Sequence, residues 1–241
     1  MDKSTMTDSA YRGWEYATKG DYHRELDPNW SYTPTYLRKM HHVRRFLDNF
    51  SCNVRILDIG CGEGVLVEEY AAKGYAIEGL DLNYESQWVK RGNVLDMPYK
   101  DDTFDIVLLL DVFEHIAFSD QPRALHEIRR VLKPGGWFLA SIPNLAHLNS
   151  RVRLLLKGKL DRTDIEINHP GERTIGENIS LLNANGFKIV AVKGITLTLP
   201  WLYRQVICRH PARFRWLHDW LDRFAVPSLA MINLFVCQRY E

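Results

Sequence analysis

The pattern of apolar and polar positions predicts short strands that alternate with helices. Leu37, Met40, Val43 and Leu47 recur every three or four residues, which is typical of an amphipathic helix over about 35–50. Short apolar runs predict buried strands at 54–59, 76–82, 88–94, 104–110, 137–142, 187–192 and 231–237. Periodic segments between them predict further helices at 65–73, 121–132, 145–156 and 175–184. This order is typical of an α/β fold with a mostly parallel sheet and helices on both faces.

Two stretches depart from this alternation. Residues 1–34 are rich in tyrosine and tryptophan, and we expect them to form an approach segment or a lid that excludes water from a site, or simply to pack against the first helix. Residues 194–230 predict a helical insertion before the last strand, 231–241. With the core at 35–193, the 241 residues have the size of a single domain.

Composition narrows the classes of function. The net charge of +1 argues against a protein that neutralises many phosphates, so nucleic acid is not an expected partner. The first ten residues are polar, and the strongly apolar run at 106–110 is far shorter than the ~20 residues that span a bilayer. The four cysteines are scattered without a CxxC pair, which is typical of reduced thiols rather than of a disulfide scaffold or a zinc site. We therefore expect a cytoplasmic protein.

Glycines at alternate positions follow the predicted strand at 54–59. A strand that ends in Gly60-Cys61-Gly62-Glu63-Gly64 and opens a helix lets the backbone approach a ligand and directs helix N-terminal amides at it. Nicotinamide-binding folds use similar glycines, but Val65 stands where they place a further one. Asp58, before the first glycine, suits a ligand with a positively charged amino group better than it suits a pyrophosphate.

Two further acids follow the ends of later strands. Asp81 lies 21 residues after Gly60, where a carboxylate can accept both hydroxyls of a ribose in either class of protein. Asp96, in Leu95-Asp96-Met97-Pro98, holds a position suited to an adenine amino group. Only fourteen residues separate Asp81 from Asp96, so the helix between these strands is expected to be very short or absent.

In this order, these residues resemble the class I S-adenosylmethionine-dependent methyltransferases. The matching segments are 57–64, Asp81, 96–98, 104–107 and the Lys-Pro-Gly-Gly turn within 131–136. The resemblance covers about 35–193 and implies a Rossmann-like seven-stranded sheet with an antiparallel last strand. It also implies S-adenosylmethionine as the cofactor and S-adenosylhomocysteine as the product. The cofactor-binding residues implied are Asp58, Gly60, Cys61, Gly62, Gly64, Asp81, Leu82, Leu95, Asp96, Met97 and Asp111.

The candidate chemical groups follow the predicted central strand, in Asp111-Val112-Phe113-Glu114-His115. His115 can act as a general base at neutral pH, with Glu114 beside it. Alternatively, Glu114 and His115 begin a helix and hold the cofactor loop by hydrogen bonds. A third interpretation rests on resemblance, because Asp111, Glu114 and His115 are similar to the acid-x-x-Glu-His cluster of ubiquinone-biosynthesis O-methyltransferases, which is linked to a divalent ion. The prediction carried forward is catalysis by His115 and Glu114 without a metal.

Basic and aromatic residues bear on the choice of methyl acceptor. His169 and Arg173 either bind an anionic acceptor or belong to a solvated loop. Two stretches, 145–163 and 201–225, are basic, and the second contains five arginines and two acids among aromatic residues. This second stretch resembles an interfacial helix at a membrane surface. The other interpretations are a homodimer interface and a cap that packs the side chains of Trp216, Leu217 and Trp220 over the sheet.

The resulting hypothesis is an enzyme that passes a methyl group from S-adenosylmethionine to a small-molecule or cell-envelope acceptor, at oxygen rather than at carbon. A non-catalytic S-adenosylmethionine-binding or scaffold protein is the alternative from another class. A nicotinamide-dependent oxidoreductase is disfavoured by Asp58, Val65 and Asp96.

Overall fold

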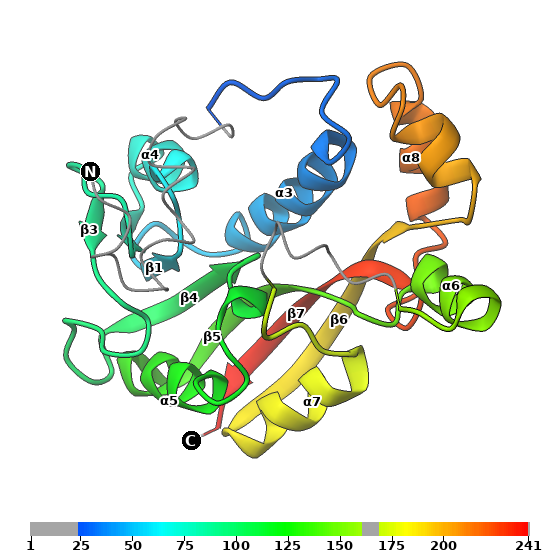
Figure 1. The fold of residues 1–241 in the computed structure, drawn as a ribbon. Helices are drawn as coiled ribbons and strands as arrows, with labels where there is room; N and C mark the ends of the chain where they lie inside the picture. Colours follow the sequence, from blue (N-terminus) through cyan, green and yellow to red (C-terminus); the bar gives the residue numbers. More distant parts are fainter. Residues whose placement is uncertain (1–23, 161–168, 241) are drawn as a thin grey trace, which may run out of the picture.

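A seven-stranded sheet organises the described part of the chain, which is residues 24–160 and 169–240 of a computed structural model (Figure 1). The strands follow the order β3-β2-β1-β4-β5-β7-β6. Their bounds are β1 (Arg55–Ile59), β2 (Ala76–Asp81), β3 (Val89–Arg91), β4 (Phe104–Leu110), β5 (Leu132–Pro143), β6 (Phe187–Leu197) and β7 (Ala230–Arg239). Strands β1 to β5 pair in parallel, and β7 runs antiparallel to both β5 and β6. The predicted mostly parallel sheet with an antiparallel last strand is confirmed.

Helices cover both faces of this sheet (Figure 1). Their bounds are α3 (Thr33–Leu47), α4 (Val65–Ala72), α5 (Gln121–Val131), α6 (Leu148–Lys157), α7 (Ile175–Ala184) and α8 (Arg215–Asp222), with a 3₁₀ turn η2 (Phe113–His115) and a π-helical turn η3 (Tyr203–Ile207). Most of the segment expected at 1–34 falls on residues 1–23, which lie outside the described residues. Within the described ranges, no helix is both long enough and apolar enough to cross a membrane.

Strand β4 carries the two hydrophobic layers, because successive side chains of a strand point to opposite faces. Val107 and Leu109 belong to the cluster that α5 and α7 complete, whereas Ile106 and Leu108 belong to the cluster that α3 and α4 complete. All four side chains are fully buried. This double covering explains why Phe104–Leu110 is a nearly continuous apolar run, and why the sequence predicts its bounds correctly.

Two connections determine what lies beside the sheet. No helix separates β2 from β3, which confirms the prediction made from the short spacing of Asp81 and Asp96. Strand β6 is longer than expected, because it pairs with β7 as far as Leu197 opposite Ala230. The insertion expected at 194–230 therefore begins only after Leu197, and it holds η3 and α8.

Helix α8 turns a polar face toward the rest of the protein. Asp222 Oδ2 accepts a hydrogen bond from Arg38 Nε of α3 at 2.6 Å, and Asp222 Oδ1 accepts one from the Thr196 amide of β6 at 2.7 Å. The interpretation that Trp216 and Trp220 pack over the sheet is wrong, because these residues are 66% and 49% exposed. The buried carboxylate, not the indoles, fixes which face of α8 is inward.

We expect Asp222→Asn to lower the free energy of unfolding by about 1.5–3 kcal/mol, the range for a hydrogen bond with a charged partner. The variant keeps the size of the side chain and leaves the Arg38 guanidinium without its anion. Urea unfolding measures the change. Asp219→Asn is the matched control, because its carboxylate is 42% exposed and lies 3.8 Å from Arg215. The control should change stability by no more than about 0.5 kcal/mol. Equal stability of the two variants would contradict the role assigned to Asp222.

Candidate active site

A cavity of about 570 Å³ opens at the carboxyl ends of β1, β2 and β4. Open α/β sheets bind ligands at this edge, and the volume lies within the ~300–1,000 Å³ of small-molecule sites. The wall combines α3, the glycine loop after β1, two segments at 80–84 and 92–95, and residues between 110 and 120 that follow β4. The cavity therefore gathers most of the sequence segments that were expected to carry chemistry.

The glycine loop is shaped by two contacts that exclude a side chain. Gly60 has a φ of +70°, and a Cβ atom there would lie 2.3 Å from Val112 Cγ2. Gly64 has a φ of +80°, and its Cβ would lie 2.6 Å from Val89 Cγ2. Only glycine fits such positions without strain. Gly60 and its neighbours Cys61 and Gly62 line the cavity, whereas Gly64 packs against β3 and is not among the described lining residues.

Asp81, at the end of β2, joins the glycine loop to the following turn. Its Oδ2 accepts a hydrogen bond from the Gly62 amide at 2.9 Å. Its Oδ1 accepts hydrogen bonds from the amides of Asn83 and Tyr84, at 2.8 and 3.2 Å. Asp81 and the next residue, Leu82, both line the cavity. Backbone amides thus hold this carboxylate at the cavity wall.

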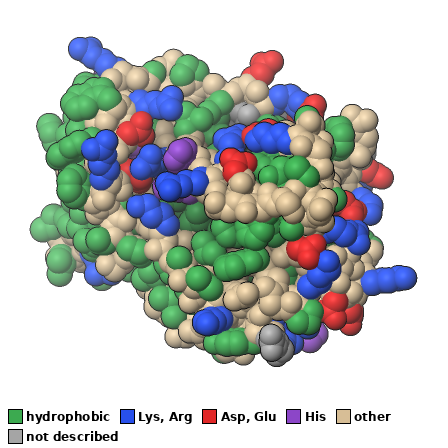
Figure 2. All heavy atoms as spheres, turned by 180° about the vertical axis from the view of Figure 1, so that it is seen from behind, with side chains coloured by type: hydrophobic (Ala, Val, Ile, Leu, Met, Phe, Trp, Pro, Cys, Tyr) green, Lys and Arg blue, Asp and Glu red, His purple; other side chains and the backbone are tan. Residues whose placement is uncertain are grey.

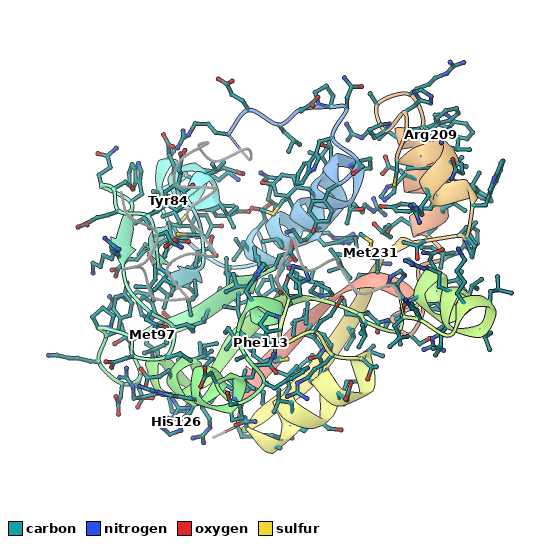
Figure 3. All side chains as sticks on the ribbon, viewed as in Figure 1. Tyr84, Met97, Phe113, His126, Arg209 and Met231 are labelled. Carbon is teal, nitrogen blue, oxygen red and sulfur yellow. The ribbon has the colours of Figure 1, made fainter. Side chains whose placement is uncertain are left out.

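Of the three residues expected at the adenine, Leu95, Asp96 and Met97, only the first lines the cavity, because of a turn that follows β3. Asn93 Oδ1 accepts a hydrogen bond from the Leu95 amide at 2.9 Å, and the Asn93 carbonyl accepts one from the Asp96 amide at 3.0 Å. Asn93 and Leu95 line the cavity. Asp96 is exposed and Met97 is buried in the core, and neither is among the described lining residues. Figure 3 shows Met97 well apart from Tyr84, which does line the cavity.

Asp58 contributes a buried carboxyl group to the cavity wall. The residue is 4% exposed, and no donor among the described residues hydrogen-bonds its carboxylate. Burial raises the pKa of Asp58 to about 7, while nearby Lys39 opposes the shift and Asp81 adds to it. A cation that enters the cavity and contacts this group would favour its ionised form.

Lys39, which is buried, and Asp111, which is partly buried, form an ion pair at the cavity wall. Lys39 Nζ lies 2.5 Å from Asp111 Oδ2, which also accepts a hydrogen bond from the Tyr32 hydroxyl at 2.6 Å. Ser141 Oγ donates to Asp111 Oδ1 at 2.5 Å. Burial opposes the ionisation of Asp111, but these three groups outweigh it and hold its pKa below the ordinary value. The sequence analysis did not single out Lys39, although it falls on the apolar face of its helix with Met40 and is only 3% exposed.

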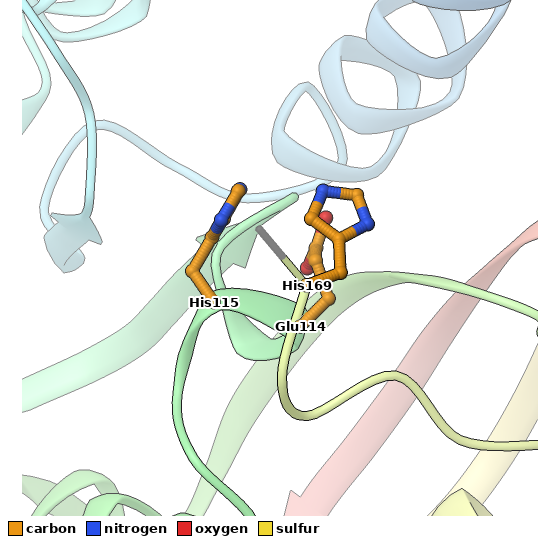
Figure 4. A group of neighbouring side chains, drawn as sticks. All are labelled: Glu114, His115 and His169. Atoms are coloured by element: carbon orange, nitrogen blue, oxygen red, sulfur yellow. The ribbon is translucent and has the colours of Figure 1, made fainter. Parts of the chain in front are cut away.

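Glu114, His115 and His169 converge beside the cavity (Figure 4). One ligand atom from each side chain lies within 4.8 Å of the others, and the two imidazole centroids are 4.7 Å apart at 85°. His115 lines the cavity, whereas Glu114 and His169 are not among the described residues that line it. Asp111, the third member of the expected cluster, is occupied by Lys39 instead. Among the described residues, the group that could hold a metal therefore contains His169 in place of Asp111.

Burial sets the protonation of this cluster. It raises the pKa of Glu114 well above the ordinary value, and the charge of Asp111 adds to the shift. Burial also lowers the pKa of His169 to about 4, and His115 contributes in the same direction. Glu114 Oε2 has no hydrogen-bond partner within the described residues. Burial thus favours the uncharged forms of Glu114 and His169.

Arg173 is engaged away from the cavity. Its Nε donates a hydrogen bond to Gln121 Oε1 at 2.7 Å, and its guanidinium lies 4.4 Å from the centroid of the Phe118 ring. Gln121 in turn donates to the Gly171 carbonyl at 2.8 Å. These contacts hold the segment that carries His169, and Arg173 itself is not among the described lining residues.

The chain matches a model of a methyltransferase domain over residues 30–192, which is more than half of its length. The chain belongs to this family. Ubiquinone biosynthesis O-methyltransferases of Paraburkholderia phymatum and Paraburkholderia xenovorans are 29% and 31% identical to this methyltransferase over 51% of its chain. The alignments span 59% of the length of each of these two relatives.

The fold of this methyltransferase agrees with its family. An S-adenosylmethionine-dependent methyltransferase from Methanosarcina mazei matches it with a TM-score of 0.54, over 81% of this chain and 97% of the other. At 19% identity this likeness shows the fold alone. By family and by fold the chain is a class I S-adenosylmethionine-dependent methyltransferase, and S-adenosylmethionine is its cofactor.

The residues at the cavity suit that cofactor. The buried Asp58 carboxyl has no donor among the described residues and would hold the ammonium of the methionine part. Asp81, at the end of β2, would accept the ribose hydroxyls, and the wall at Asn93 and Leu95 would contact the adenine. Gly60, which lines the cavity, has no side chain and lets Val112 pack against the loop.

We expect Asp58→Asn to weaken the binding of S-adenosylmethionine by roughly 10- to 100-fold, the value of a charge-assisted contact. In the wild type, protonation of Asp58 competes with the ligand cation. Because the pKa of Asp58 is raised to about 7, affinity should fall as the pH drops through that value, from about pH 8 to about pH 6. Calorimetric titration across this range measures both effects.

The Asn variant supplies the control for the pH dependence. Its affinity should vary with pH only as far as the cofactor's own amino group titrates. A wild-type affinity that does not change between these pH values, or an unchanged affinity in Asp58→Asn, would exclude the ammonium contact.

Proposed function

We propose that this methyltransferase transfers the methyl group of S-adenosylmethionine to an oxygen of a small-molecule or cell-envelope acceptor. The observation that carries the proposal is the position of His115, which lines the same cavity as Asp58 and Asp81. A hydroxyl acceptor must lose a proton, and a histidine at the cavity wall is the side chain best suited to take it at neutral pH. The names of the two Paraburkholderia relatives also favour oxygen.

Bound S-adenosylmethionine supplies an activated methyl group on a sulfonium, so the protein contributes mainly alignment, which is worth up to ~7–11 kcal/mol. Asp58 would hold the ammonium of the cofactor and Asp81 its ribose hydroxyls, while the Lys39–Asp111 pair keeps α3 against the cavity. An imidazole nitrogen of His115 accepts the proton of the acceptor hydroxyl.

Glu114 and His169 support His115 rather than replace it. The raised pKa of Glu114 favours its protonated form, so its carboxyl does not compete as a base. The lowered pKa of His169 keeps a neutral ring beside His115, so the proton that His115 accepts meets no second positive charge there. This arrangement needs no metal ion for the proton transfer.

We expect His115→Gln to lower the rate of methyl transfer by about 10²–10⁴-fold, the contribution of a general base, with little change in cofactor affinity. The assay measures release of S-adenosylhomocysteine with a panel of phenols, sugars, carboxylic acids and amines. Wild-type turnover should be greatest with a hydroxyl acceptor.

Three outcomes would contradict parts of the proposal. Cofactor binding without turnover on any acceptor would favour a non-catalytic binding protein. Turnover confined to amines would exclude the oxygen acceptor. A rate that EDTA abolishes and a divalent ion restores would assign Glu114, His115 and His169 to a metal instead of to proton transfer.

A further inference from the structure

One end of the molecule exposes the apolar faces of two helices. In α8 the buried residues are His218, Leu221 and Asp222, while Trp216 and Trp220 are 66% and 49% exposed. In α6 the buried residue is Ser150, and the leucines at 154–156 are exposed. Both helices thus expose large apolar side chains, whereas ordinary surface helices turn their apolar side to the core.

The two helices belong to one surface. The Leu148 amide of α6 donates to the Leu229 carbonyl, and Arg151 donates to the Ser228 carbonyl, so α6 is bonded to the turn that follows α8. Trp201, between β6 and η3, is 71% exposed. Figure 1 places α6 and α8 at the same end, and Figure 2 shows hydrophobic and basic side chains mixed along that end, on its left. We call this surface, formed by α6 and by residues 201–226, the basic aromatic end.

Its charge is strongly positive. Residues 201–226 contain five arginines, which are Arg204, Arg209, Arg213, Arg215 and Arg223, and all five are exposed. Of the two acids there, Asp222 is buried against Arg38, so Asp219 alone offsets them at the surface. Lys157 and Lys159 add exposed positive charge beside the α6 leucines. Figure 3 shows Arg209 at the outer edge of this segment.

We propose that the basic aromatic end docks on the surface of an anionic lipid bilayer. Exposed indoles and leucines insert at the boundary between head groups and acyl chains, and arginines and lysines beside them attract anionic head groups. Each property alone is common, but their combination on one surface matches the composition of such an interface. The proposal is independent of which acceptor the cavity takes.

The charge disfavours a second copy of the chain as the occupant of this surface. A two-fold dimer sets the same patch against itself, so five arginines would face five arginines with one exposed acid on each side. The centres of protein interfaces are depleted in charged residues, whereas here the arginines are interleaved with the aromatic side chains. An anionic bilayer instead complements the whole surface.

The test is flotation of the full chain with vesicles of phosphatidylcholine alone and with vesicles that also contain phosphatidylglycerol. We expect binding to the anionic vesicles only. Binding should weaken as the salt concentration rises, because the Debye length falls from ~10 Å at 0.1 M to ~3 Å at 1 M ionic strength. Trp216→Ser/Trp220→Ser and Arg209→Glu/Arg213→Glu should each weaken binding by about tenfold or more.

The matched control is Lys188→Glu/Val190→Ser, which changes exposed residues at the start of β6, away from the basic aromatic end. This variant should bind vesicles as the wild type does. Calorimetric titration with S-adenosylmethionine should give the wild-type affinity in every variant, which shows that each has folded.

Absence of wild-type binding to anionic vesicles would overturn the proposal, as would equal losses in the control and in the patch variants. A wild-type dimer in sedimentation that dissociates in Trp216→Ser/Trp220→Ser, without vesicle binding, would assign the surface to a second copy.

Discussion

The buried ion pair of Lys39 and Asp111 is the interaction on which the site depends. It joins α3 to the carboxyl end of β4, and Tyr32 and Ser141 complete the ring of partners around the same carboxylate. Because one charge without its partner is costly in a buried place, by about 3–5 kcal/mol, the two elements are held together. The positive φ of Asp111, 55°, then turns the chain so that η2 presents His115 to the cavity. Cofactor wall and candidate base are thus placed by one contact.

Most strands of the sheet can be predicted from the sequence because their apolar runs and flanking turn residues are local features of the chain. The continuous apolar run of β4 and the glycines after β1 are examples, and both lie where they were expected. Lys39 shows where such reasoning ends. Its partner Asp111 is 72 residues away, and a lysine on an apolar helix face is indistinguishable, in sequence, from one that extends to solvent. The contact between His169 and His115 could not be predicted for the same reason, because it is a tertiary contact that spacing in the sequence does not encode.

The turn after β3 and helix α8 show a second limit, which concerns direction rather than distance. Asp96 was expected to face the adenine, but the Asn93 side chain caps the turn and leaves Asp96 exposed. In α8 the periodic sequence pattern indicates that the two faces of the helix differ in polarity. It does not indicate which face packs against the protein. The choice is made by Arg38 and by the Thr196 amide, which satisfy the carboxylate of Asp222. Burial of a charge that has partners outweighs burial of indoles that can face an interface.

Helix α3 connects the basic aromatic end with the cavity. Arg38 holds α8, and the next residue, Lys39, holds Asp111, so adjacent side chains of one helix reach the proposed docking surface and the cofactor wall. Tyr36 and Met40, one turn apart on the same helix, line the cavity. Helix α3 therefore contacts both α8 and the cavity wall through adjacent side chains. An acceptor that resides in a bilayer would meet the enzyme at the end of the molecule to which this helix is already tied.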